Sequence, residues 1–229
     1  MSIAERYLAV RRKVDDACRS AGRTPESVKL IAVTKYVDTE RMEEAFLSGA
    51  RCMGENHAQE VREKLTFYKN NAIELHFIGQ LQTNKIKYII GNAEYVHSVD
   101  REHLLTALAA AAEKAGCVQK ILLQVNIGRE PQKGGILPEE LEKLTEQALT
   151  HTSLALKGLM CVPPENEPEK ARAYFAELRE RRDRLQQQYP EADLSELSMG
   201  MSRDFEEAIL EGATMVRVGS AIFGPRSMK

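Results

Sequence analysis

The stretch EEAFLSGARCMGEN, residues 43–56, returns near the other end of the chain as EEAILEGATMVRVGS, residues 206–220. Each copy reads as a helical segment, a glycine that stops the helix, and a short apolar strand. The two stop positions are Gly49 and Gly212. The repeat therefore predicts that one helix-and-strand unit is used more than once.

Short apolar runs occur eight times along the 229 residues, and helical patterns separate them. Strands that alternate with helices predict a parallel sheet, and eight such units fit a closed (β/α)8 barrel, which typically takes about 250 residues. We expect a single domain over 1–229. An open doubly wound sheet is the alternative, but GxGxxG and GxxxxGK[ST] motifs are both missing. The expected strands are 28–34, 51–55, 75–79, 95–99, 120–126, 156–162, 197–200 and 215–219.

Residues 1–22 predict an extra helix packed on the barrel, because apolar residues recur there at helical spacing. The expected stripe is Ile3, Tyr7, Val10, Val14 and Ala17. Asp38 or Thr39 and Asp100 are expected N-caps, and Pro138 is expected in a first helical turn. Residues expected just past helix ends are Gly49, Gly116 and Gly212.

Composition narrows the class of protein. The formal net charge is −2, so the chain lacks the basic character that nucleic-acid binding requires, and no apolar run approaches the length of a membrane span. The amino terminus lacks the apolar core of a secretory signal. The four cysteines occur singly, with no CxxC pair and no histidines at metal-ligand spacing. This pattern favours free thiols in a reducing cytoplasm over a disulfide framework or a metal site.

Polar residues follow several expected strands, and the two cations among them are the most informative. Lys35 ends the run LIAVTK, on the same face of its strand as Ile31 and Val33, and Arg217 shares a face with Met215. Closure of a barrel makes the first and last strands neighbours. If both faces point inward, Lys35 and Arg217 stand close together at the carboxyl-terminal mouth, where catalysis and binding gather in this fold. Two such cations predict a bound anion.

An anion site is also expected after the last two strands. Ser202 in SMGMSRDF is the expected N-cap of a following helix, and Gly219 and Ser220 precede a short final helix. Helix amino termini bind phosphate, and the loops after strands seven and eight are a recurrent phosphate site in this barrel. GMSRD also resembles a GxSxG nucleophile elbow, but Asp204 replaces the second glycine and no His/Asp partners are recognisable.

A phosphate site beside a lysine suits a ligand that carries both a phosphate and an aldehyde. Burial near Arg217 is expected to lower the pKa of Lys35, so that its neutral amine can attack a carbonyl and form a Schiff base. Pyridoxal 5′-phosphate (PLP) fits these requirements. A Schiff-base aldolase acting on a phosphorylated sugar is a further alternative, although Glu55 and Asp100 do not decide whether acid/base groups stand beside the lysine.

A set of motifs spread from residue 28 to residue 226 resembles the pyridoxal phosphate homeostasis protein family, the YggS-like PLP-binding proteins. The motifs are LIAVTK (30–35), GEN (54–56), HFIGQLQTNK (76–85), QVNIG (124–128), GLM (158–160), LSMGMSRD (197–204) and VRVGSAIFG (216–224). The resemblance implies a barrel like the amino-terminal domain of alanine racemase, which binds PLP without established turnover and contributes to vitamin B6 and amino-acid homeostasis.

The resemblance also implies a role for each matching position. Lys35 would hold PLP as a Schiff base, Arg217 would face the pyridine nitrogen, and Asn56 would lie near the ring hydroxyl. The phosphate would bind to Ser202, Gly219 and Ser220, and the ring would be lined by Met160 and Met201. Two positions depart from the family pattern: His57 stands where a tyrosine often follows GEN, and Lys133 is followed by two glycines instead of by Ser-Gly or Thr-Gly.

A PLP-dependent amino-acid racemase is the main functional alternative. An arginine facing the pyridine nitrogen favours the unprotonated ring and so weakens carbanion stabilisation. Racemisation also needs a second acid/base group, which a partner subunit with an additional domain supplies in alanine racemase, and we expect no such domain here. We therefore expect a monomer that carries PLP, with PLP-dependent apoenzymes as possible recipients and with neither nucleic acid nor membrane as partner.

Overall fold

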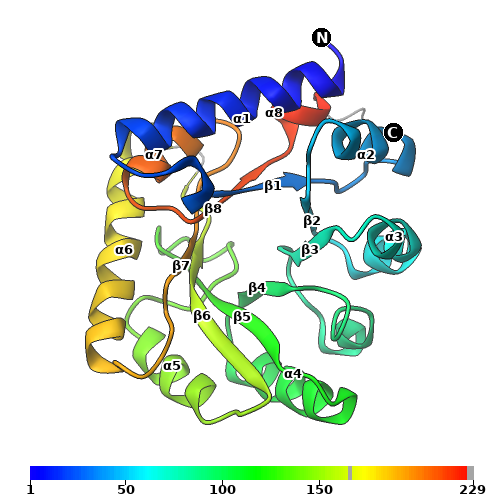
Figure 1. The fold of residues 1–229 in the computed structure, drawn as a ribbon. Helices are drawn as coiled ribbons and strands as arrows, with labels where there is room; N and C mark the ends of the chain where they lie inside the picture. Colours follow the sequence, from blue (N-terminus) through cyan, green and yellow to red (C-terminus); the bar gives the residue numbers. More distant parts are fainter. Residues whose placement is uncertain (165–166, 226–229) are drawn as a thin grey trace.

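The computed structural model describes residues 1–164 and 167–225, and its centre is a closed barrel of eight parallel strands in the order β1 to β8 (Figure 1). The predicted barrel is therefore confirmed. Most strand ends lie within about two residues of the predicted ones. The strands are β1 (Lys29–Val33), β2 (Cys52–Glu55), β3 (Glu74–Phe77), β4 (Tyr95–Val99), β5 (Gln119–Val125), β6 (Leu154–Cys161), β7 (Glu196–Ser198) and β8 (Met215–Val218).

Helices surround the barrel, as the alternating pattern predicted (Figure 1). Between β3 and β4 the crossover is a 3-10 helix, η2, in place of an α-helix. The α-helices are α1 (Ile3–Ser20), α2 (Thr39–Leu47), α3 (Ala58–Asn70), α4 (Glu102–Ala115), α5 (Leu141–Leu149), α6 (Ala171–Gln188), α7 (Phe205–Leu210) and α8 (Ser220–Phe223). The 3-10 helices are η1 (Pro25–Ser27), η2 (Thr83–Tyr88) and η3 (Pro168–Lys170).

The amino-terminal helix α1 lies across α7, α8 and α2 at one side of the barrel (Figure 1). Ser2 and Glu5 form a capping box at its start, which satisfies backbone N–H groups that the helix leaves unpaired. Its predicted apolar stripe is buried in full, from Ile3 to Ala17. Each large aliphatic or aromatic side chain buried in this way stabilises the fold by roughly 1.5–3 kcal/mol, so α1 is held to the barrel by its sequence pattern.

Several predicted helix ends are confirmed. The Asp38 carboxylate caps α2 by accepting a hydrogen bond from the backbone N–H of Arg41. Gly49 and Gly212 follow the C-caps of α2 and α7 with φ values of 107° and 95°, and Gly116 ends α4 with φ of 65°. These left-handed conformations favour glycine because it has no Cβ.

Two predictions of helix starts are wrong. The N-cap of α4 is Arg101, and Asp100 instead accepts hydrogen bonds from Arg101 and from the backbone N–H of Gly135. Pro138 lies in a turn before α5, which begins only at Leu141. In the first case the carboxylate has partners in a neighbouring loop, and such tertiary contacts are not visible in the local sequence.

The barrel interior holds a small apolar cluster made of Ile31, Tyr95, Leu122, Met160 and Met215. A much larger apolar core lies between the strands and the helices. Several other inward positions carry polar side chains, and these form the candidate site.

Candidate functional site

Arg217 lies inside the barrel, where its guanidinium has a fixed orientation. Its Nη1 donates a hydrogen bond of 2.6 Å to Ser198 Oγ, and its Nη2 donates one of 2.8 Å to the backbone carbonyl of Cys161. Only 4% of the residue is exposed. Burial lowers the pKa of Arg217, but an arginine stays charged at neutral pH even so. The barrel therefore contains one held cation beneath its carboxyl-terminal mouth.

A chain of hydrogen bonds runs from Arg217 down through the interior. Ser198 Oγ lies 2.8 Å from His97 Nδ1, and His97 Nε2 lies 2.8 Å from His76 Nδ1. His76 Nε2 then lies 3.0 Å from a carboxylate oxygen of Glu74, at the start of β3. Burial lowers the pKa of both histidines, so both are neutral at neutral pH. Both histidines are therefore interior residues whose ring nitrogens have hydrogen-bond partners.

Lys35 lies two residues beyond the end of β1, in a turn, and is half-buried. The next residue, Tyr36, has a φ of 61° and is exposed, and its hydroxyl lies 2.9 Å from His57 Nε2. The predicted pairing of β1 with β8 is confirmed, and it sets Ile31 opposite Arg217. Lys35 therefore lies four residues further along, roughly 13 Å of strand. The lysine is at the rim of the barrel and the arginine is deeper, whereas the alternation of the sequence predicted both at the mouth.

Asn56 follows β2 and carries an unpaired buried oxygen. Its Oδ1 is shielded from solvent and has no hydrogen-bond partner within the described part of the chain. Such an atom costs free energy unless a ligand or water donates to it. The preceding Glu55 is fully buried and accepts hydrogen bonds from Lys64, Thr34 and Tyr68. All three bonds reach Oε1 on the helix side of the sheet, and Oε2 is buried without a hydrogen-bond partner within the described residues.

Ser202 does not cap α7, and this prediction is wrong. The N-cap of α7 is Asp204, whose carboxylate accepts a hydrogen bond of 2.6 Å from the backbone N–H of Met201. That bond draws residues 201–204 into a turn. Ser202 Oγ instead accepts a hydrogen bond of 3.4 Å from the backbone N–H of Ala221. The hydroxyl thus belongs to the start of α8, and the loops after β7 and β8 meet at one point.

The remaining predicted positions surround the same end of the barrel. Met160 is buried in β6 within the interior cluster, and Met201 is half-buried in the turn after β7. Gly219 directly precedes α8, and Ser220 is its exposed first residue. Gly219 lies beside Val33 of β1, where an added Cβ would be 3.4 Å from the valine side chain.

Sequence reasoning missed the residues that hold Arg217. Ser198, which accepts from Arg217, and Glu74, at the far end of the hydrogen-bond chain, were not singled out. The signal that could have found them is alternation, because polar residues occur at every second position in β3, β4 and β7. These residues are Glu74 and His76 in β3, Tyr95 and His97 in β4, and Glu196 and Ser198 in β7. In a barrel those positions all face the interior.

The fold and this arrangement match one class of protein. Residues 9–227 match the family described as alanine racemase, N-terminal domain. A curated relative from Aquifex aeolicus, named pyridoxal phosphate homeostasis protein, is 44% identical over 99% of both chains. A protein of the same name from Escherichia coli is 36% identical over 98% of this chain and 97% of its own. The chain therefore belongs to the pyridoxal phosphate homeostasis protein family.

A solved structure agrees with that assignment. PipY of Synechococcus elongatus PCC7942, determined with PLP bound, is 34% identical and aligns over 97% of this chain and all of its own, with a TM-score of 0.86. Within residues 1–164 and 167–225, no helix is long and apolar enough to cross a membrane.

Proposed function

We propose that this chain binds PLP at the carboxyl-terminal mouth of the barrel and acts in PLP homeostasis, with Lys35 as the covalent attachment point. The observation that carries the proposal is that PipY, a relative of the same fold that aligns over 97% of this chain, was determined with PLP bound. This chain carries a lysine just beyond β1, at its own barrel mouth, and a buried arginine deeper in the barrel on β8.

The residues present fit the chemical groups of the cofactor. The unpaired Oδ1 of Asn56 would accept a hydrogen bond from the ring hydroxyl. Ser202 and the backbone around Gly219 and Ser220 lie together and would bind the phosphate. Met160 and Met201 would pack against the ring with polarisable side chains. Bound PLP supplies an aldehyde that a lysine amine can capture and a ring that can accept electron density.

Arg217 would set the protonation state of the pyridine nitrogen of bound PLP. Its guanidinium has hydrogen bonds to Ser198 and to the Cys161 carbonyl, and it cannot give up a proton at neutral pH. Facing the pyridine nitrogen, it would donate a hydrogen bond and leave that nitrogen unprotonated. This weakens the ring as an electron sink, so we propose a carrier and not an efficient racemase.

The wider role follows from the same reasoning. We propose that the protein works as a monomer in the cytoplasm and that PLP-dependent apoenzymes are recipients of its cofactor. Four free cysteines, two of them buried, are compatible with a reducing compartment.

The central experiment is to purify the protein with PLP and reduce it with borohydride. The tryptic peptide that contains residue 35 should gain the mass of a reduced pyridoxyl phosphate group. A protein that neither copurifies with PLP nor takes it up would contradict the proposal.

A second assay separates carrier from racemase. The loaded protein is incubated with L-alanine, and D-alanine is measured over time. We expect no accumulation beyond that of free PLP. Accumulation at enzymatic rates would favour the racemase alternative and would leave the binding proposal intact.

A further inference from the structure

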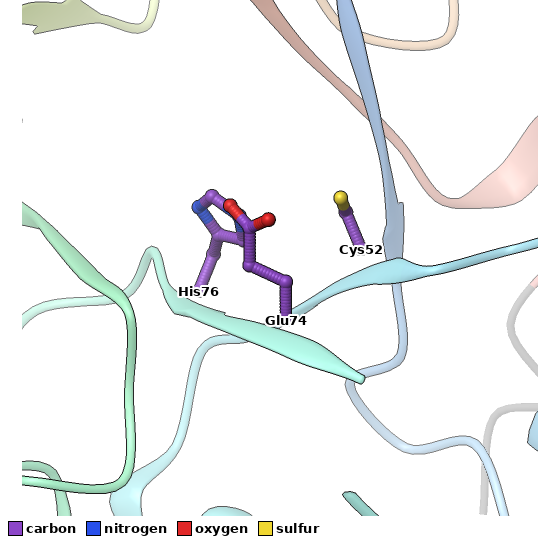
Figure 2. Close-up of side chains that lie close together, drawn as sticks. All are labelled: Cys52, Glu74 and His76. Atoms are coloured by element: carbon purple, nitrogen blue, oxygen red, sulfur yellow. The ribbon is translucent and has the colours of Figure 1, made fainter. Parts of the chain in front are cut away.

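The side chains of Cys52, Glu74 and His76 lie close together (Figure 2). Cys52 and Glu74 are the first residues of their strands, so the cluster is at the amino-terminal end of the barrel, opposite the mouth that holds Lys35. Cys52 begins β2 and pairs in register with Glu74, the first residue of β3. His76 lies two residues further along β3, on the same face. The thiol, a carboxylate oxygen and an imidazole nitrogen all lie within 4.8 Å of one another.

We propose that Cys52 Sγ, a carboxylate oxygen of Glu74 and Nε2 of His76 form a binding site for a divalent transition-metal cation, with Zn²⁺ as the best match. Thiolate, imidazole and carboxylate are the donors that Zn²⁺ takes in proteins, and three protein ligands leave a fourth position for water. This site was not predictable from the sequence, because its ligands are brought together by strand register and not by a CxxC-type spacing.

Without a metal, the space between the three ligand groups contains two protons, one on His76 Nε2 and one on the Cys52 thiol. The Glu74 carboxylate accepts hydrogen bonds from His76 Nε2, at 3.0 Å, and from the Cys52 thiol. A divalent cation would replace both protons and would keep the same three groups around one point. Tetrahedral geometry at normal bond lengths puts ligand atoms roughly 3.3–3.8 Å apart, so distances of up to 4.8 Å need to shorten by about 1.5 Å at most.

The outer hydrogen bonds already suit a metal-bound histidine. Such a histidine usually donates its other ring N–H to a fixed acceptor. His76 Nδ1 lies 2.8 Å from His97 Nε2, and His97 Nδ1 lies 2.8 Å from Ser198 Oγ. When the cation takes Nε2, the proton of His76 moves to Nδ1 and donates to His97, whose own proton moves to Nδ1 and donates to Ser198. The His76–His97 and His97–Ser198 hydrogen bonds are thus kept with their direction reversed, and Arg217 continues to donate to Ser198.

Charge at this end of the barrel also favours a cation. Three carboxylates, those of Glu74, Glu94 and Glu196, surround Tyr95 together with the ammonium groups of Lys29 and Lys120. These three carboxylates and two ammonium groups carry a net charge of −1. Binding of a divalent cation, with loss of the Cys52 thiol proton, would bring the net charge of the cluster to zero. Lys29 opposes binding because it forms an ion pair of 2.5 Å with Glu74. The Glu74 side chain is 29% exposed, which leaves a route from solvent.

The test is titration of the full-length protein with Co²⁺ as a spectroscopic substitute, followed by competition with Zn²⁺. We expect one equivalent to give a thiolate-to-cobalt band in the near ultraviolet and the visible bands of tetrahedral coordination. Cys52→Ser should abolish the thiolate band and lower affinity by at least ~100-fold, and Glu74→Gln and His76→Gln should each lower it by at least ~10-fold.

Two controls separate this site from other metal binding. Cys117→Ser removes another half-buried thiol and should leave the bands unchanged. Lys35→Ala should also leave them unchanged, because its position is at the opposite end of the barrel, so failure of the proposed PLP function would not affect this result. The proposal is overturned if no saturable binding occurs, or if the thiolate band survives in Cys52→Ser. Should Cys52→Ser fail to fold, an unchanged affinity in Glu74→Gln would overturn it equally.

Discussion

Arg217 on β8 pairs in register with Ile31 on β1, so the backbone of Arg217 lies four residues deeper in the barrel than that of Lys35. The guanidinium is held by hydrogen bonds to Ser198 Oγ and to the Cys161 carbonyl. We therefore expect a ligand that contacts both cations to present one end to the lysine and the other end to the arginine.

The first prediction concerns Lys35. Lys35→Ala removes the only group that we propose for covalent attachment, so borohydride should no longer fix pyridoxyl phosphate to the protein. Residual PLP should dissociate on gel filtration. The measurement is the absorption spectrum together with intact mass after reduction.

A neighbouring lysine provides the control for this change. Lys133 lies in the loop after β5, where it forms an ion pair of 3.0 Å with Glu130. Lys133→Ala should keep the full reduced adduct. Equal loss of adduct in both variants would show that attachment is not specific to residue 35.

The second prediction concerns Ser198, which links Arg217 to the interior histidines. Ser198→Ala leaves a buried guanidinium hydrogen without a partner, which costs roughly 1–3 kcal/mol of unfolding free energy. A protein of this size shifts its Tm by roughly 2–4 °C per kcal/mol, so the Tm should fall by about 2–12 °C. PLP affinity should fall as well, by about 10-fold, because Arg217 loses its fixed orientation. Thermal unfolding and PLP titration measure the two effects.

Ser195→Ala is the matched control, because this serine is exposed just before β7. Its Tm and its PLP affinity should both match those of the unaltered protein. A Ser198→Ala protein with unchanged affinity would mean that the hydroxyl does not position Arg217.

The third prediction concerns a buried ion pair behind the sheet. Lys64 Nζ on α3 lies 2.8 Å from a carboxylate oxygen of Glu55, and the Glu55 side chain is fully buried. Burial raises the pKa of Glu55, and Lys64 opposes that shift. Lys64→Met leaves the carboxylate without its partner and should cost about 3–5 kcal/mol in urea unfolding.

Two further variants test whether the loss of stability comes from the unpaired Glu55 carboxylate. Lys69→Met, at an exposed position of the same helix, should change stability by less than about 0.5 kcal/mol. Glu55→Gln combined with Lys64→Met should recover much of the loss, because no unpaired charge remains. No recovery in the double variant would indicate that packing of the lysine stem matters more than its charge.

The fourth prediction concerns alkaline pH. Burial raises the pKa of the Cys161 thiol from 9.0 to about 12. A raised folded-state pKa means that the unfolded chain loses this proton first, so stability is full below pH 9 and declines as pH rises toward 12. The contribution to the unfolding free energy should fall by about 1.4 kcal/mol per pH unit in that window. Cys161→Ala should remove this part of the slope between pH 9 and 11, and Cys117→Ala should not.

Much of the fold was predictable because its signals are local. The repeated EEAxL segments, Gly49 and Gly212 mark helix ends through backbone conformation alone, and the buried stripe of α1 follows from helical spacing. The cap at Asp38 is of the same kind. Asp100 and Ser202 were assigned wrongly because their side chains bond to loops distant in sequence, at Gly135 and Ala221.

For the candidate site, the sequence predicted the residue types, and the register of the strands decided their positions. Lys35 and Arg217 could be placed on inward faces by alternation, but their relative depth depends on the stagger that closes the barrel. The hydrogen-bond chain through Ser198, His97 and His76 depends on the same stagger.

By itself, then, the sequence determined an eight-unit barrel, its helix ends and the chemistry available at each strand, because these follow from periodicity and backbone preference over a few residues. Only the tertiary structure decided which side chains meet. Cys52 and Glu74 are far apart in the chain but opposite each other across two strands, and a contact of that kind exists only once the sheet has closed with one particular register.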